Sequence, residues 1–207
     1  MSLFNDVFVA KVVQEFRVLG GRDQTAGMKA IITGFEAYDS IHDPRWLAYM
    51  LATAFHETAS TMQPVREAFW RTEDWRRKNL GYFPYYGRGY VQLTHQANYK
   101  KAGKDIGVDL VADPDLALRP NYAAHVMYKG MTEGWFRKDR QGPHMLQRYF
   151  GPDVDDPVGA RNIINGREVK TVGGKKVTVA EIIADYHAVF LEALKDGQKH
   201  VQVRPGR

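Results

Sequence analysis

Residues 43–58 have the sequence DPRWLAYMLATAFHET, and this stretch predicts the central helix of the fold. Asp43 can accept the unpaired backbone N–H groups at a helix start, and Pro44 suits the first helical turn. Apolar residues then recur at helical spacing as far as Ala54, so we expect the helix to end near Glu57. The helix therefore delivers a histidine and a carboxylate at its exit.

Helical periodicity recurs along most of the chain, together with one hairpin signal. Gly173-Gly174 between alternating residues is typical of a two-residue hairpin turn, and Thr178 with Glu181 forms a capping box for the last helix. We expect one mainly α domain over residues 1–207, with two lobes around a cleft and a small β-hairpin. The expected helices fall within residues 3–19, 28–35, 43–57, 96–106, 120–135 and 178–194, with a short one opening at 155–157, irregular structure or a short ribbon over 58–90, and a flexible basic tail over 196–207.

Composition excludes several classes of protein. The chain has 207 residues, no cysteine and a formal net charge of +5, so a disulfide-stapled scaffold and thiolate metal sites are excluded. No run of about 18 apolar residues occurs, so we expect no stable membrane insertion. The first twenty residues lack a signal-peptide pattern, which predicts synthesis in the cytoplasm and a separate route for any extracellular work. A pI of 9.3 favours polyanionic surroundings such as nucleic acid or a cell wall.

The pair His56-Glu57 first suggests a zinc site. A metalloprotease helix needs a second histidine one turn later, but that position is Ser60, so we expect neither a metal nor a cofactor. A lone glutamate at a helix end is usually a solvated residue. The apolar helix before Glu57 and the polar loop after it make a catalytic role worth testing.

A second carboxylate follows ten residues later, at Glu67. Two carboxylates in one cleft are what glycosidic bond cleavage requires: one donates a proton to the leaving oxygen, and the other activates water or stabilises positive charge on the sugar. A separation of about 6.5–9.5 Å between the two carboxyl groups would give inversion of the anomeric centre, and a separation of about 5 Å would give retention. The sequence leaves both outcomes open. The plain alternative is a surface ion pair with Arg66, and Glu73 competes with Glu67 for the role of base.

Residues 69–90 hold eight aromatic residues among five basic ones. Aromatic faces stack on sugars as well as on nucleic-acid bases, although about half of these rings should simply pack in the core. Basic residues are dispersed along the chain and no nucleic-acid motif occurs, so we expect no nucleic-acid partner.

The most specific signal is residues 85–94, YYGRGYVQLT, followed by Asn98-Tyr99. Gly87 and Gly89 permit a tight turn or a close approach to a ligand. Gln92, Thr94 and Asn98 offer neutral hydrogen-bonding groups that suit sugar hydroxyls and acetamides.

These segments together resemble glycoside hydrolase family 19, a lysozyme-like group of plant and bacterial chitinases and phage endolysins. The resemblance covers about residues 43–195 and includes 161–166, RNIING. It implies Glu57 as general acid, Glu67 as general base and Thr94 as the hydroxyl that holds the attacking water. It further implies substrate contacts or support from His56, Tyr86, Gln92, Asn98 and Asn165. The chain departs from the family's pattern at Ala59-Ser60 and in its short segment after Glu67.

The resemblance, taken with the lack of a signal peptide, of cysteine and of a chitin-binding module, predicts a monomeric endolysin-type enzyme. We expect it to cleave β-1,4 bonds of peptidoglycan, with inversion, after release through a membrane pore. A chitinase acting on N-acetylglucosamine polymers is the nearest alternative, since the sugar and linkage are shared. A non-catalytic glycan-binding protein with the same cleft is the alternative from another class.

Overall fold

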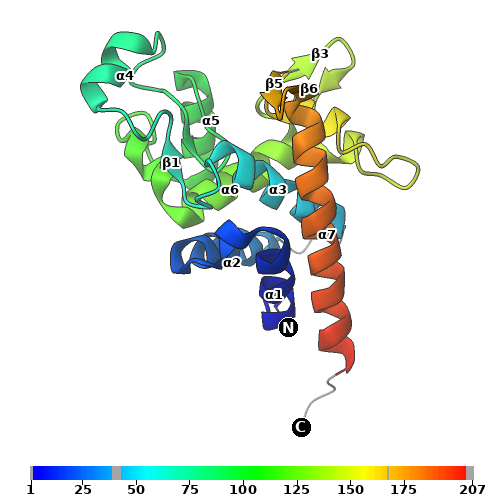
Figure 1. Cartoon of the computed structure of the whole chain (residues 1–207). Helices are drawn as coiled ribbons and strands as arrows, with labels where there is room; N and C mark the ends of the chain where they lie inside the picture. Colours follow the sequence, from blue (N-terminus) through cyan, green and yellow to red (C-terminus); the bar gives the residue numbers. More distant parts are fainter. Residues whose placement is uncertain (1, 39–42, 167, 204–207) are drawn as a thin grey trace.

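The computed structural model describes residues 2–38, 43–166 and 168–203, and its seven α-helices carry most of the fold (Figure 1). The helices are α1 (Asp6–Glu15), α2 (Arg22–Glu36), α3 (Pro44–Glu57), α4 (Glu73–Asn79), α5 (Gln96–Ile106), α6 (Pro120–Glu133) and α7 (Val179–Val203). The 3₁₀ turns are η1 (Arg17–Gly20), η2 (Pro114–Leu118), η3 (Leu146–Arg148) and η4 (Gly159–Ile163). A mainly α architecture is thus confirmed.

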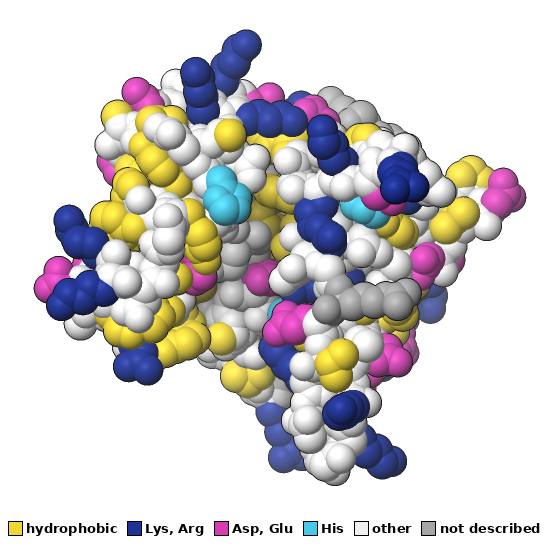
Figure 2. Space-filling view, turned by 90° about the horizontal axis from the view of Figure 1, so that it is seen from above, with side chains coloured by type: hydrophobic (Ala, Val, Ile, Leu, Met, Phe, Trp, Pro, Cys, Tyr) yellow, Lys and Arg dark blue, Asp and Glu magenta, His cyan; other side chains and the backbone are white. Residues whose placement is uncertain are grey.

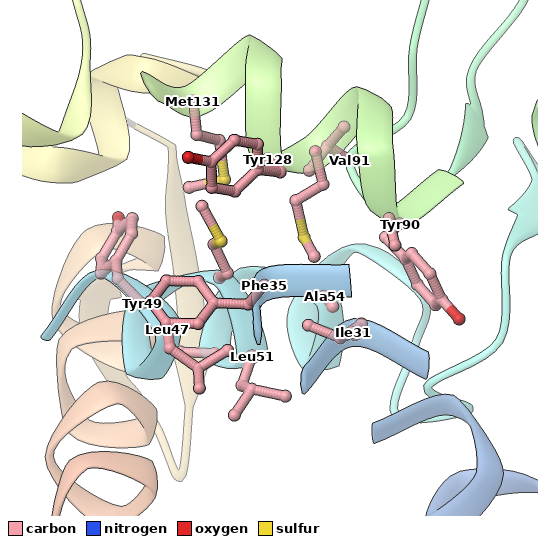
Figure 3. Close-up of a cluster of buried hydrophobic side chains, with 14 of the residues drawn as sticks. Ile31, Phe35, Leu47, Tyr49, Leu51, Ala54, Tyr90, Val91, Tyr128 and Met131 are labelled. Atoms are coloured by element: carbon pink, nitrogen blue, oxygen red, sulfur yellow. The ribbon is translucent and has the colours of Figure 1, made fainter. Parts of the chain in front are cut away.

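Helix α3 is the centre of the molecule. The Asp43 carboxylate accepts a hydrogen bond from the Arg45 backbone N–H at 2.9 Å, and Pro44 occupies the first turn, as the sequence predicts. Every residue from Leu47 to Phe55 is buried, which is typical of a helix enclosed by protein rather than lying on a surface. Figure 3 shows α3 side chains such as Leu51 within the shared core. The capped start and the buried middle of α3 fix the position at which Glu57 leaves the helix.

Two groups of elements flank the upper end of α3 in Figure 1. One contains α4, α5, α6 and the ribbon formed by β1 (Val65–Arg66) and β2 (Arg88–Gly89), whose register pairs Val65 with Gly89. The other contains the hairpins β3 (Lys138–Asp139) with β4 (Gly142–Pro143) and β5 (Val169–Val172) with β6 (Lys175–Thr178). These two lobes and the central helix confirm the lysozyme-like helical fold.

Several local predictions are confirmed by the backbone. The Thr178 hydroxyl accepts from the Glu181 N–H at 3.2 Å, and the Glu181 carboxylate accepts from the Thr178 N–H at 2.8 Å, which is the expected capping box. The hairpin turns at Gly173 and Gly174, both with positive φ. Helix α5 has the predicted bounds, and α6 ends at Glu133 because Gly134 adopts a left-handed cap.

Three features differ from the sequence expectations. Helix α4 lies within the segment expected to be irregular, capped by the Thr72 hydroxyl. The short helix expected from residue 155 is the 3₁₀ turn η4. The tail expected to be flexible is helical from residue 196 to Val203, because α7 packs along α1. The Asn5 side chain donates a hydrogen bond to the Gly197 carbonyl, and Lys11 forms an ion pair with Glu192. Residues 204–207 lie outside the described residues.

Within residues 2–38, 43–166 and 168–203, no helix has both the length and the apolar character needed to cross a membrane.

Candidate active site

A cleft of about 610 Å³ opens between the two lobes at the exit of α3. Figure 2 shows this hollowed face, with acidic side chains within the hollow. Its lining comes from the end of α3, the segment around β1, the loop after β2 and the segment from η4 to β5. The predicted site residues that line it are His56, Glu57, Glu67, Gln92, Thr94, Asn98 and Asn165. Segments distant in sequence thus converge on one concave surface.

Glu57 occupies the last position of α3 and is ion-paired with Arg161 of η4. The Arg161 side chain is 4% exposed and that of Glu57 is 15% exposed, so this pair forms the floor of the cleft rather than its rim. Glu168 approaches the same guanidinium at 3.8 Å. No role for Arg161 was predicted, and the available signal was its charge beside Ala160 in the segment 161–166, RNIING.

Glu67 follows β1 and faces the cleft through a carboxylate that is held at both oxygens. The Tyr82 hydroxyl donates to Oε1 at 2.8 Å, and the Gly87 N–H donates to Oε2 at 2.9 Å. The Glu67 backbone N–H donates to the Gly87 carbonyl at 2.7 Å, which fixes the main chain beside the ribbon. Burial, followed by the hydrogen bond and negative charge of Glu67, raises the pKa of Tyr82 to about 12. Tyr82 therefore stays a hydrogen-bond donor at neutral pH.

Arg76 of α4 anchors the loop that carries Glu67. Its buried guanidinium donates to the Glu67 carbonyl at 2.8 Å and to the Ala68 carbonyl at 3.0 Å. Ala68 has a φ of 48°, a left-handed conformation that is uncommon for residues other than glycine. The guanidinium thus fixes two consecutive carbonyls of the loop that carries Glu67. This role of Arg76 was not predictable from the sequence, because it depends on a helix that the hydrophobic periodicity does not indicate.

The segment after β2 presents polar groups from a constrained backbone. The Thr94 hydroxyl donates to the Gln92 carbonyl at 2.7 Å, which leaves the hydroxyl oxygen able to accept a hydrogen bond. Asn98 donates to the Thr94 carbonyl at 2.9 Å. Gln92 and His95 both have positive φ values, of 54° and 71°. Strained backbone of this kind is found preferentially at functional sites.

His56 contributes a neutral imidazole to the cleft. Burial, followed by the charges of Lys170 and Arg161, lowers the pKa of His56 to about 4. At neutral pH the ring can therefore both donate and accept a hydrogen bond without adding charge beside Glu57.

Tyr86 and Glu73 lie outside the cleft lining. Tyr86 is fully buried, which corrects the expectation that it contacts substrate; it supports the fold through its ring, with the Arg88 guanidinium 3.7 Å from the ring centroid. Its hydroxyl donates to the Glu73 carboxylate at 3.0 Å, and Arg76 pairs with that carboxylate at 3.1 Å. Glu73 therefore faces a neighbouring cavity rather than the cleft that contains Glu57.

Within the part of the chain that the structure describes, no group of three or more histidine, aspartate or glutamate side chains could hold a metal ion. The chemistry available in the cleft is that of carboxylates, including Glu57 and Glu67, of basic side chains including Arg161, of a neutral histidine, and of hydroxyl and amide groups. That combination suits acid and base catalysis at a glycosidic bond.

A helical two-lobed fold with paired glutamates in its cleft defines the class of lysozyme-like glycoside hydrolases. The chain belongs to glycoside hydrolase family 19, described as chitinase class I, whose family model matches residues 57–188. The family resemblance inferred from the sequence is thus confirmed.

Relatives and solved structures agree with this assignment. Chitinase 8 of Oryza sativa subsp. japonica is 49% identical over 127 residues, covering 55% of this chain and 46% of that protein. The acidic 26 kDa endochitinase of Solanum lycopersicum is 65% identical over 96 residues, covering 40% of this chain and 37% of that protein. The chain thus spans less than half the length of these relatives.

The crystal structure of chitinase C from Streptomyces griseus HUT6037 has the same fold, with a TM-score of 0.57 at 21% identity over 92% of this chain and 78% of that one. A second bacterial family 19 chitinase structure gives a TM-score of 0.53 at 22% identity, over 90% of this chain and 93% of that one.

Proposed function

We propose that this protein hydrolyses β-1,4 bonds between N-acetylglucosamine units, as a chitinase does. One observation carries the proposal: two carboxylates, Glu57 and Glu67, reach the same cleft from different elements and have different partners. The family and the names of the relatives favour chitin as the polymer.

In the proposed reaction, Glu57 donates its proton to the glycosidic oxygen as the bond from that oxygen to the anomeric carbon breaks. The bonding electrons stay with the leaving oxygen, and the sugar passes through a positively charged transition state. Arg161 then stabilises the carboxylate that remains on Glu57. Arg161 thus stabilises the enzyme after proton transfer, when Glu57 is ionised.

Glu67 takes a proton from the attacking water, whose oxygen bonds to the anomeric carbon. Tyr82 and the Gly87 N–H hold this carboxylate in one orientation, so little reorganisation is needed during the reaction. The Thr94 hydroxyl donates its own proton to the Gln92 carbonyl, so its oxygen can accept a hydrogen bond from the second O–H of the water, and that O–H becomes the hydroxyl of the product. Attack from the face opposite the leaving group would invert the anomeric centre.

Neutral groups around these carboxylates suit an uncharged sugar. Asn98 and Asn165 place side-chain amides at the cleft, and His56 presents an uncharged imidazole there. Such groups match the hydroxyls and acetamides of N-acetylglucosamine.

Peptidoglycan is a second candidate substrate, favoured by the cations Arg66, Arg137 and Lys170 in the cleft lining and by the net charge of +5. Under this proposal the protein would act as an endolysin on the cell wall after passing a membrane pore. Its positive charge would strengthen association with an anionic wall at low salt.

Mass spectrometry of the products tests the proposal directly. Purified protein is incubated with chitin oligosaccharides and with isolated peptidoglycan, and NMR records the anomer formed first. Release of N-acetylglucosamine oligomers as the α-anomer is the expected result. Muropeptides without chitin products would select the endolysin alternative, and binding without turnover of either polymer would leave a glycan-binding protein.

Three glutamate substitutions assign the catalytic roles. Glu57→Gln should lower kcat by about 10²- to 10⁴-fold, because an amide has no proton to give to the leaving oxygen. Glu67→Gln should be similarly impaired, whereas Glu73→Gln, outside the cleft, should retain at least half of the activity. The opposite ranking of the last two variants would move the base to Glu73.

A further inference from the structure

Two aromatic side chains beside Glu67 are unusually exposed. Trp70 is 69% exposed and Phe69 is 43% exposed, while the other exposed large hydrophobic residues in the described part of the chain are all valines. Large aromatic rings are normally buried, because their apolar surface is the main source of favourable packing. Both rings line the cleft. An exposed aromatic pair at the edge of a cleft is typical of a ligand-binding surface.

The backbone that carries the pair is held in one conformation. The Arg71 N–H donates to the Ala68 carbonyl at 2.8 Å and closes a turn around the two aromatic residues. The guanidinium of Arg76 donates a second hydrogen bond to the same carbonyl at 3.0 Å. The rings are therefore presented on a preorganised loop, which lowers the entropic loss when a ligand binds.

The ring geometry leaves a surface available for stacking. The Phe69 and Trp70 centroids lie 5.2 Å apart with the planes at 77°, an edge-to-face arrangement. In such a pair the ring that supplies its edge keeps both of its own faces uncovered by its partner. A flat apolar face next to polar groups suits the apolar face of a pyranose ring, which carries C–H bonds on one side and hydroxyls around its rim.

We propose that Phe69 and Trp70 form a sugar-stacking subsite that binds a saccharide unit on the Glu67 side of the bond to be cleaved. This inference rests on the proposed glycan substrate and deepens it. Because Trp70 follows Glu67 by three residues on the anchored loop, a sugar stacked there fixes how a long chain is placed relative to the carboxylate. The subsite thus selects longer oligosaccharides over short ones.

Tryptophan fluorescence gives a direct measurement. Of the four tryptophans, Trp70 is the one that lines the cleft. In a Glu57→Gln background, which prevents turnover, the N-acetylglucosamine hexasaccharide and trisaccharide are titrated separately. The hexasaccharide should change the emission, and Trp70→Ala should remove that change and weaken hexasaccharide binding by about 3- to 10-fold. The weakening for the trisaccharide should be less than twofold.

Matched variants separate stacking from loop stability. Trp70→Tyr should recover most of the hexasaccharide affinity, since it keeps an aromatic face. Trp75→Phe is the control, because Trp75 is half-buried on α4 and outside the cleft lining; it should leave affinity and activity unchanged.

The two proposals fail in different ways. Active wild-type protein whose hexasaccharide affinity survives Trp70→Ala would overturn the subsite and leave the hydrolase standing. Trp70-dependent hexasaccharide binding by a wild-type protein that cleaves nothing would retain the subsite and overturn the hydrolase. Equal weakening for both oligosaccharides would also overturn the subsite, as would Trp70-dependent, salt-sensitive binding of a single-stranded oligonucleotide in preference to the hexasaccharide.

Discussion

Replacing Arg161 tests whether the Arg161–Glu57 pair determines the electrostatics of the cleft floor. Arg161→Met keeps an unbranched apolar side chain of similar length but leaves the Glu57 carboxylate without its cation. Both side chains are largely shielded from water, at 4% and 15% exposure. Removing one partner of a buried pair is strongly destabilising, whereas removing both is much less so.

The expected loss in the free energy of unfolding follows from how well the pair is shielded from water. A fully buried orphaned charge would cost about 3–5 kcal/mol, but Glu57 faces an open cleft and keeps some contact with water, so we expect about 2–3 kcal/mol. For a chain of this length that corresponds to a fall in Tm of about 5–10 °C. Adding Glu57→Gln to Arg161→Met should then restore about 1–2 kcal/mol, because the unpaired charge is gone.

Urea denaturation of the four proteins in this double-mutant cycle measures the effect. Arg148→Met is the matched control: its ion pair with Asp139 is more exposed, so the loss of stability should be below about 1 kcal/mol. A double variant less stable than Arg161→Met alone would refute the reasoning, because the orphaned carboxylate could not then be the cause of the instability.

Three further predictions concern the cleft and the core. Gly87→Ala should lower kcat by about 10- to 100-fold, because its Cβ would lie 2.7 Å from the Gln92 side-chain oxygen and 3.2 Å from Glu67 Oε2, so both cleft side chains would have to move. Gly81→Ala is the control, because the space around Gly81 is open, and equal kcat values for the two variants would contradict the prediction. Thr94→Val should lower kcat more than it raises KM, and a change in KM alone would make Thr94 a binding residue. Burial lowers the pKa of His187 to about 4, so as the pH falls the imidazole is protonated in the unfolded chain before it is protonated in the folded protein. The contribution of His187 to the free energy of unfolding should therefore be complete above about pH 6.5 and lost towards pH 4, a change of up to about 3 kcal/mol in urea titrations. His187→Phe should show a flatter dependence of stability on pH.

Elements specified by neighbouring residues were predictable from the sequence. The Asp43-Pro44 start of α3, the Gly173-Gly174 turn and the Thr178 capping box depend on hydrogen bonds and dihedral angles within a few residues. Such signals operate locally and need no knowledge of the rest of the chain. The motif over residues 85–94 likewise indicated the family.

Contacts between distant segments were decided only by the tertiary structure. Arg161 meets Glu57 across 104 positions of sequence, and Arg76 fixes the Glu67 loop from a helix that the aromatic, basic composition of its segment concealed. Packing also decided against two expectations. Tyr86 is enclosed in the core, and the end of α7 stays helical because α1 lies beside it. Charge pairing and burial depend on which surfaces the fold brings together, and local sequence signals carry no record of that.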